Sequence, residues 1–412
     1  MGTLRKIFEF NLGQAIFMNI IIMLINILFA YIVKKIVSKK YKKTNSVEET
    51  LYLQQMILKY GMNILIIISA FVITLILMPH IKWMGRYKVF GALFIVYAEM
   101  FLVLIVDQLL LYDINKQLRK TTSTKKEHIV SLLKIFVFSA TPVILMITII
   151  EFNPLKNLNS ERLEKYGTII LIVGTYILIS LIMPMFTKFL LKGTDLKEGE
   201  LKEGLTQFVK SAGIKKLRLF LWPTKKQRHA NALVSGLITK NIFLSDYLIE
   251  NFSQEEIESI LAHEIGHLKK HHLWKRTIFI IGIIIIFPAI GALMELYEEH
   301  YNTEIPIWLG LGLLAVLFIG YVVFLRRYIN RKQESQADGF VLQMGIHPIV
   351  YAGALYKLTK LNNAVMKFNK VDEKMQTHPS TARRIRNVLK KGNVSEDEFN
   401  KYIDEKISIE LN

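Results

Sequence analysis

Long runs of hydrophobic residues alternate with polar segments along the chain, and this pattern predicts membrane-spanning helices. Each run holds about twenty residues with few charges, enough for an α-helix to cross a hydrocarbon core roughly 30 Å thick. Seven runs have this character, at residues 14–33, 61–78, 90–111, 129–150, 167–190, 276–296 and 306–325. We therefore expect a mainly α-helical, polytopic membrane protein with about seven transmembrane helices.

Two charged regions separate these runs, so the pattern predicts four parts of the chain. Residues 1–191 would hold five spans, and residues 276–325 would hold two more. The charged parts are residues 192–275 and the C-terminal residues 326–412. Because an even number of spans lies between them, both charged parts are expected on the same face of the membrane.

The first charged part contains short hydrophobic runs of β type, which predict a small sheet. They lie at residues 217–222, 232–235 and 242–244. Ser253 followed by Glu256 is a capping-box signature, and the hydrophobic residues that follow recur at helical spacing. A helix is therefore expected to begin at about Gln254.

The second charged part is expected to form three helices. One runs through Glu334 to a stop at Gly345, the next begins at Pro348, and the last covers residues 380–391. Residues 196–205, in the first charged part, are expected to form only a solvated linker helix.

The formal net charge of the 412-residue chain is +19, although 52% of its residues are hydrophobic. Such a charge can indicate a nucleic-acid partner. The basic residues gather, however, in the loops after the first and third spans and after the last one, whereas the loop after the sixth span is acidic. Since positively charged loops face the cytoplasm, we expect an external N-terminus and two cytoplasmic charged parts. One loop, with Lys82, Arg86 and Lys88, departs from this rule.

The predicted surroundings are thus a lipid bilayer and no nucleic acid. The membrane would be the cell membrane in a bacterial host or the endoplasmic reticulum membrane in a eukaryotic one.

A pair of histidines in the helix after Gln254 points to metal chemistry. The chain has no cysteine, so a metal would have to be held by His and carboxylate side chains. His263 and His267 are four residues apart, so their imidazoles lie on one helix face and can supply two ligands of a tetrahedral zinc ion. Glu264 lies at the flank of that face, where it can act as the general base on water.

The third ligand distinguishes the classes of zinc peptidase. A further histidine on the same helix would require Gly at position 270 and His at position 273, but Lys270 and Leu273 stand there. A carboxylate from a later helix remains, and Glu334 can supply one, with Asp338 one turn on to hydrogen-bond a ligand imidazole. We predict one zinc ion per chain, held by His263, His267 and Glu334.

These residues and their neighbours resemble the family of membrane zinc metallopeptidases that includes CaaX prenyl protease 1 and the heat-shock protease HtpX. The segment LAHEIGHLKKHH, residues 261–272, is similar to the family's zinc-binding helix, and RKQESQADGF, residues 331–340, is similar to its third-ligand motif. The motif from Asn231 to Gly236 and the His378 and Arg384 motif also fit. With five spans before the zinc-binding helix, the chain resembles the CaaX prenyl protease 1 branch more than HtpX.

The resemblance implies a helical barrel that encloses a chamber, with a small cytoplasmic α+β zinc-peptidase domain. Residues Asn231, Ala232 and Gly236 would belong to an edge strand, to which an extended peptide adds by main-chain hydrogen bonds. His378 and Arg384 would be catalytic residues that contact the substrate carbonyl or the oxyanion.

The resemblance also extends to one further histidine of the charged parts. His271, one turn beyond His267, would support the metal site as a partner of its ligands. The others are expected to be structural only: His229, His272 and His347.

The predicted function is zinc-dependent hydrolysis of peptide bonds by a membrane-embedded metalloendopeptidase. Its substrates would be short or membrane-associated peptides or proteins, including lipidated ones of CaaX type. Within this class, quality control of membrane proteins in the manner of HtpX is the alternative. In other classes, the chain would be a metal-binding transporter or an inactive scaffold; the histidine pair outside the spans opposes the first, and the intact Glu264 opposes the second. The oligomeric state is left open.

Overall fold

Six long apolar helices confirm the prediction of a polytopic membrane protein. The computed structural model describes residues 11–62, 88–153 and 161–411, together with residues 65, 68, 69, 72, 80 and 155. Within this part of the chain, six helices are long and apolar enough to cross a membrane. They match six of the seven predicted spans, and the predicted span at residues 61–78 lies largely outside the described residues.

The chain divides into two compact units, Met1–Asn157 and Leu158–Asn412. The helices of the first unit are α2 (Leu12–Thr44), α3 (Val47–Met56), η1 (Ile57–Met62), α5 (Lys88–Arg119) and α6 (Lys125–Glu151). Two pairs of polar side chains lie within this unit: Asn19 Nδ2 donates to Glu99 Oε1 at 3.1 Å, and Asn26 Nδ2 donates to Ser69 Oγ at 2.9 Å. Such pairing lowers the cost of polar groups within a bilayer.

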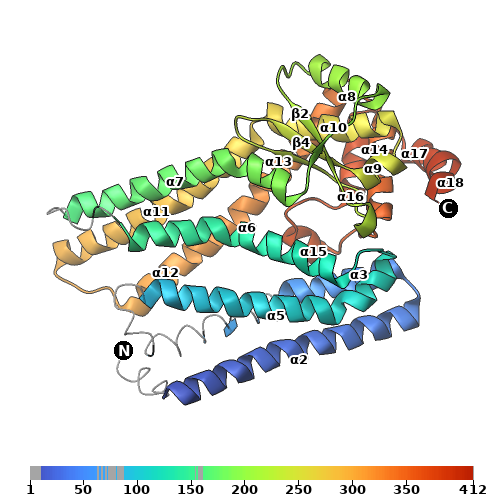
Figure 1. Cartoon of the computed structure of the whole chain (residues 1–412). Coiled ribbons are helices and arrows are strands. Elements are labelled where there is room, and N and C mark those ends of the chain that lie inside the picture. The colour runs from blue at the N-terminus through green and yellow to red at the C-terminus, as the bar shows by residue number, and fades with distance from the viewer. Residues whose placement is uncertain are drawn as a thin grey trace. The chain divides into compact units, whose positions relative to one another are not determined.

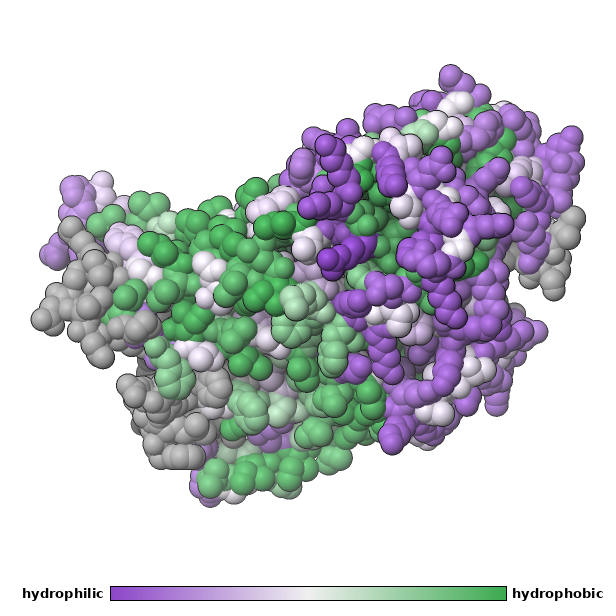
Figure 2. All heavy atoms as spheres, turned by 45° about the horizontal axis from the view of Figure 1, so that its top comes forward, coloured by the Kyte–Doolittle hydropathy of each residue, from purple (hydrophilic) through white to green (hydrophobic). Residues whose placement is uncertain are grey.

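The second unit holds the remaining spans, and Figure 1 labels them along the chain. They are α7 (Glu161–Leu190), α11 (His272–Tyr301) and α12 (Ile307–Ile319), which continues through the π-helical turn η5 (Gly320–Leu325) into α13 (Arg326–Gln343). Hydrophobic side chains cover the visible surface of the long helices, whereas hydrophilic ones gather over the polar part of this unit (Figure 2). The barrel implied by the family resemblance would join spans of both units and stays a prediction.

A four-stranded sheet lies in the polar part, as the β-type runs predict. Its strands are β1 (Thr194–Asp195), β2 (Arg218–Trp222), β3 (Ala232–Ser235) and β4 (Asn241–Ser245), in the order β1-β2-β4-β3. Strand β2 runs parallel to β4, and β3 runs antiparallel to it. Strand β3 is thus at the edge of the described sheet.

The backbone conformation after β3 requires a glycine. Gly236 has φ +107°, and a Cβ added there would lie 1.8 Å from the carbonyl oxygen of Thr239. This position therefore requires glycine to close the β3–β4 hairpin.

Helices of the polar part pack in two hydrophobic clusters, one of which they share with the sheet. Helix α10 (Gln254–Lys269) begins with the predicted capping box of Ser253 and Glu256. Helices α14 (Pro348–Leu361) and α16 (Thr381–Lys391) match the predicted ones. Buried Lys357 of α14 donates to Glu256 Oε2 at 3.0 Å and also bonds Glu410, so α14 secures the start of α10.

Two local expectations were wrong. Helix α8 (Glu200–Ser211) buries Leu205 and Val209 against the core instead of being fully solvated, because its apolar residues share one face. Helix α16 is also not the last one, since α17 (Glu396–Tyr402), η6 (Ile403–Ile407) and α18 (Ser408–Leu411) follow it. Phe399, Ile403 and Ile407 of this extension are buried against α14 and α16.

Candidate metal centre

Helices α10 and α13 bring the predicted ligands together because they approach each other closely. Gly266 on α10 faces α13, and a Cβ added there would lie 3.1 Å from the Cα of Ala337 and from the Cβ of Phe340. The missing side chain of Gly266 and the small one of Ala337 allow this contact. Glu334, one turn before Ala337, then lies beside His263 and His267.

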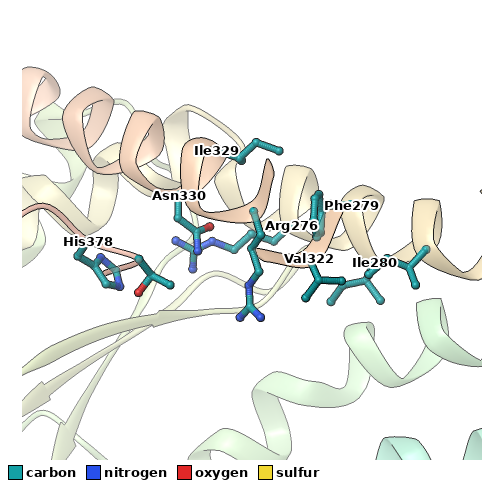
Figure 3. Close-up of a pocket in the computed structure, with 10 residues that line it drawn as sticks. Arg276, Phe279, Ile280, Val322, Ile329, Asn330 and His378 are labelled. Carbon is teal, nitrogen blue, oxygen red and sulfur yellow. The ribbon is translucent and has the colours of Figure 1, made fainter. Parts of the chain in front are cut away.

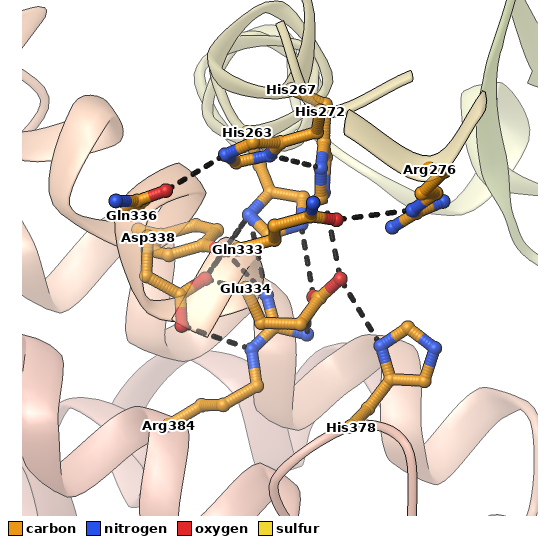
Figure 4. Close-up of polar contacts among 11 residues, drawn as sticks. His263, His267, His272, Arg276, Gln333, Glu334, Gln336, Asp338, His378 and Arg384 are labelled. Carbon is orange, nitrogen blue, oxygen red and sulfur yellow. Dashed lines mark hydrogen bonds and ion pairs between the residues drawn. The ribbon is translucent and has the colours of Figure 1, made fainter. Parts of the chain in front are cut away.

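The ligand atoms of the three side chains point toward one place. The two imidazole Nε2 atoms of His263 and His267 are 3.2 Å apart. Glu334 Oε2 is 3.4 Å from His263 Nε2, and Glu334 Oε1 is 3.6 Å from His267 Nε2. All three residues are buried, and they form a group that can hold a metal ion. Figure 4 shows the two rings and the carboxylate turned toward one another.

Burial and charge leave these ligands suited to a cation. Burial lowers the pKa of His267 to about 3, and the charge of His263 adds to this effect. The imidazole of His267 is therefore uncharged at neutral pH, and its lone pair is available to bind a metal ion. Burial alone would also lower the pKa of His263, but its hydrogen bonds to Asp338 and Glu334 raise that pKa to about 9. A divalent cation would replace that proton between His263 and Glu334.

Behind His263 lies a buried group of polar side chains that fixes its ring. Asp338 Oδ1 is 3.0 Å from His263 Nδ1, as expected for a partner of a ligand imidazole. Tyr351 of α14 donates to Asp338 Oδ1 at 2.6 Å, and its hydroxyl is 2.9 Å from His263 Nδ1. No motif in the sequence singles out Tyr351, because only the packing of α14 against α10 brings it there.

Arg384 of α16 belongs to the same group. Its Nε donates to Asp338 Oδ2 at 3.1 Å and its Nη2 to Asp338 Oδ1 at 2.6 Å, a bidentate pair. Its Nη1 is 3.9 Å from Glu334 Oε2. Arg384 is expected to contact substrate, whereas its Nε and Nη2 bond Asp338, the residue that supports His263.

The partner of His267 is His272 rather than the expected His271. His272 Nδ1 is 2.9 Å from His267 Nδ1, and His272 Nε2 is 3.0 Å from Gln336 Oε1. His271 is exposed and has φ +55° in the turn between α10 and α11, and no contact among the described residues joins its side chain to the site. Because α10 ends at Lys269, the chain turns there, and the side chain of His272 points back to His267. Helical spacing would select His271, so the expectation is wrong by one position.

His378 reaches the site from the loop before α16. Its Nδ1 lies 3.1 Å from Glu334 Oε1, and its side chain is 57% exposed. The loop is tied to α13 through Glu373 of α15 (Lys370–Met375), which accepts from Arg331 Nη2 at 3.2 Å and from the Ser380 amide at 3.3 Å. The exposed ring of His378 is therefore open to a bound molecule beside the carboxylate of Glu334.

Glu264 and the edge strand face each other across the site. The carboxylate of Glu264 interacts with the backbone N–H of Val234 in β3, and burial raises the pKa of Glu264 to about 7. A base with such a pKa is suited to take a proton at neutral pH. Since the amide of Val234 points to Glu264, it points away from β4. The predicted strand residue Ala232 shares this side of β3 with Val234, and Asn231 precedes them, its own amide donating to Ser245 Oγ at 2.9 Å.

The neighbouring histidines allow a direct test of the support behind His267. We expect His272→Asn to weaken binding of a divalent metal by about 10- to 100-fold, because partners of ligand imidazoles contribute this much. The same substitution one position earlier, His271→Asn, should leave affinity near wild type, because asparagine tolerates the positive φ of that residue. Competition with a chelator measures both. Equal losses in the two variants would contradict the assignment.

Comparisons with known proteins agree with this geometry. Residues 195–391 match the model of peptidase family M48. CAAX prenyl protease 1 of Saccharomyces cerevisiae is 29% identical over 231 residues, which are 50% of this chain and 50% of that protein. A Protease HtpX homolog of Bacteroides fragilis is 30% identical over 141 residues, 31% of this chain and 44% of that one. The chain thus spans about half the length of the curated relatives it matches.

A solved structure shares the fold over nearly the whole length. The crystal structure of S. mikatae Ste24p matches with a TM-score of 0.60 at 19% identity, covering 90% of this chain and 98% of that one.

Proposed function

Because the chain belongs to peptidase family M48, we propose that it is a zinc-dependent metalloendopeptidase of the membrane. The observation that carries this proposal is the spacing of the three ligand atoms. In a tetrahedral zinc site with bonds of about 2.0–2.1 Å, the ligand atoms are about 3.3–3.4 Å apart. The corresponding distances here are 3.2, 3.4 and 3.6 Å. Three protein ligands leave a fourth position for water or substrate, the mark of a catalytic site.

The residues around the ligands suit peptide hydrolysis. A bound zinc ion would activate water and polarise the scissile carbonyl. Glu264 accepts the proton of the attacking water as the new C–O bond forms, and delivers it to the amine nitrogen as the C–N bond breaks. The exposed ring of His378 donates a hydrogen bond to the substrate carbonyl oxygen. Arg384 acts through Asp338 by keeping the ring of His263 in place.

Strand β3 is the proposed binding edge for the main chain of the substrate. Its outward backbone groups lie next to Glu264, and an extended peptide can pair with them largely independently of its sequence. Asn231, Ala232 and Gly236 belong to this segment: Asn231 and Gly236 shape its two ends, and Ala232 lies along it.

A proline at Val234 tests this role of β3. Val234→Pro removes the outward N–H, which takes no part in the pairing with β4 and bonds Glu264 when no substrate is bound. Because a substrate carbonyl would take that N–H, we expect kcat/KM to fall roughly tenfold or more. Val234→Thr keeps the N–H and should change kcat/KM by less than about threefold. Thermal unfolding and metal content of both variants control for damage to the sheet. If the two variants turn over substrate equally well, the main-chain role of β3 is wrong.

The substrates we propose are short or membrane-associated peptides and proteins, including lipidated tails of CaaX type. The relatives named CAAX prenyl protease 1 support this choice, as do the long apolar helices of the same unit. We further propose that the N-terminus is external and that the polar parts, residues 192–275 and 326–412, together form the catalytic region on the cytoplasmic face, since basic loops favour that side. Quality control of membrane proteins is the second candidate, which the HtpX relative supports.

Incubation of the purified, zinc-loaded protein with peptide and prenyl-peptide libraries tests the proposed function. Cleavage products identified by mass spectrometry should disappear with a chelator and return with zinc. Products from prenylated peptides alone would favour CaaX-type processing, and products from unmodified peptides of many sequences would favour quality control. A zinc-loaded protein that cleaves neither library would refute the peptidase assignment.

A further inference from the structure

The loop that carries His378 is long and needs contacts that hold it in place. Residues 362–380 connect α14 to α16, and α15 within them is six residues long. Connections of this length are usually functional or disordered, so an ordered one calls for side chains that tie it down. Figure 3 shows His378 at one end of the side chains that line a pocket of about 330 Å³, which Arg276 and Arg326 also line. Because the ring of His378 is 57% exposed, its position depends mainly on the loop.

One carboxylate in this loop joins the two helices beside it. Glu373 Oε1 lies 3.2 Å from Arg331 Nη2 on α13 and 3.7 Å from Arg383 Nη1 on α16. The amide of Ser380, at the start of α16, donates to both oxygens of the same carboxylate at 3.3 Å. The backbone carbonyl of Glu373 accepts from Arg331 Nη1 at 2.6 Å. The side chain of Glu373 is 15% exposed, so these interactions are shielded from water and stronger than those of a surface ion pair.

The amide that Glu373 holds is close to His378 along the chain. Ser380 comes two residues after His378, with Pro379 between them. The proline ring fixes one backbone torsion, and it also restricts the backbone of the residue before it. Once the amide of Ser380 is held, the backbone of His378 therefore has little freedom left.

The other end of this link lies on the helix of a metal ligand. Arg331 is one turn before Glu334 on α13, so the tie to Glu373 fixes the loop against the part of α13 that carries the ligand. Figure 4 shows the ring of His378 turned toward the carboxylate of Glu334, with Nδ1 at 3.1 Å from Oε1. Without the carboxylate of Glu373, the guanidinium groups of Arg331 and Arg383 would lose their shared partner and repel each other.

Resting on the proposed peptidase function, we propose that Glu373 is a positioning residue for His378: its carboxylate keeps the ring beside Glu334, where the ring donates to the substrate carbonyl oxygen. Glu373 acts through His378 and through no contact of its own with substrate. Displacement of an active-site group by about 1 Å can lower a rate on the order of 100-fold. Loss of this carboxylate should therefore reduce turnover although the ligands and the base stay in place.

Replacement of Glu373 by glutamine tests this role. Glutamine keeps the shape of the side chain and removes the charge that the two arginines share. We expect kcat of the zinc-loaded protein to fall roughly tenfold and KM to change less than about twofold, because the hydrogen bond from His378 strengthens in the transition state. Glu396→Gln is the matched control, since it removes a carboxylate that pairs with Arg386 of α16 at 3.3 Å where both side chains are exposed. It should leave kcat near the wild-type value.

A double-mutant cycle separates positioning from a general structural role. If Glu373 acts through His378, then Glu373→Gln should lower kcat by less than about twofold in a His378→Ala background, as expected for coupled residues. Zinc affinity, measured by competition with a chelator, is the second readout, because α16 also carries Arg384, which supports the ligand His263 through Asp338. It should stay within about twofold of wild type, whereas a disturbed support of His263 would weaken it by about tenfold or more. Losses that multiply in the cycle, or such a weakening of zinc binding, would overturn the proposal.

The position of the loop can also be measured without turnover. The chain has no cysteine, so Lys374→Cys places a single spin label on an exposed residue beside Glu373. We expect Glu373→Gln to shift the electron paramagnetic resonance spectrum of this label toward a more mobile form, and Glu396→Gln to leave it unchanged. An unchanged spectrum in Glu373→Gln, or an unchanged kcat, would contradict the proposal. Failure of the peptidase function is a separate result, because it appears as the absence of chelator-sensitive cleavage by the wild-type protein, whereas the label reports on the loop in either case.

Discussion

Replacement of Glu264 by glutamine is expected to lower kcat for peptide cleavage by roughly 10²- to 10⁴-fold, the usual contribution of a general base. The carboxylate has a pKa near 7 and lies beside the ligand His263 and the edge strand, where it can take a proton from water and return it to the leaving amine. Glutamine has nearly the same shape but cannot accept that proton. Initial rates on a cleavable peptide, at saturating substrate, measure the effect.

The zinc content of the same variant separates chemistry from metal binding. Glu264 is not one of the three converging ligands, so Glu264→Gln should retain about one zinc per chain. Activity near the wild-type level, with zinc in place, would remove Glu264 from the role of base. Loss of both zinc and activity would instead show that Glu264 supports the metal site.

Removal of two ligands should abolish both metal binding and activity. The double variant His263→Ala, Glu334→Ala leaves one imidazole of the predicted set, too few for a stable site in which tetrahedral zinc normally has three protein ligands. We expect the zinc content of the purified protein to fall from about one per chain to near zero, and cleavage to become undetectable. Metal analysis by mass spectrometry, together with a cleavage assay, checks both.

The exposed His300 at the end of α11, far along the chain from the three ligands, offers a matched control for this loss. His300→Ala should keep full zinc content. Full occupancy in the double ligand variant would show that the ion is held elsewhere. Thermal unfolding of the double variant, compared with chelator-treated wild type, distinguishes loss of the metal from loss of the fold.

Much of the fold follows from local patterns that sequence alone displays. Six of the apolar runs form long helices, because a run of this length can satisfy its backbone in lipid only as a helix. Helix α10 begins where Ser253 and Glu256 can satisfy its first amides. The β-type runs form β2, β3 and β4 within one residue of their expected ends. In α8 the apolar residues share one face, which favours the burial of Leu205 and Val209, although the charges between them suggest a solvated helix.

In the metal centre, too, some features follow from local spacing and others depend on how the helices pack. Spacing on one helix predicts that His263 and His267 share a face, and the structure brings their Nε2 atoms to 3.2 Å. Gly266 carries no chemistry in the motif, yet it is the residue that lets α13 approach and bring Glu334 into the group. His272 has the role expected of His271 because of the turn after α10, whose geometry cannot be derived from helical spacing.

The sequence by itself determined the membrane spans, the start of the zinc-binding helix and the pair of imidazoles on it, together with a short set of carboxylates that could complete the site. Only the tertiary structure decided that Tyr351 and Arg384 support His263, that His272 supports His267, and that a pocket with two arginines opens beside His378. The reason is the range of the interactions. Helical spacing relates residues one or two turns apart, whereas Tyr351 and Arg384 lie 88 and 121 positions from His263 and reach it only because whole helices pack together. The contact of His272 with His267, five positions apart, depends on the turn after α10.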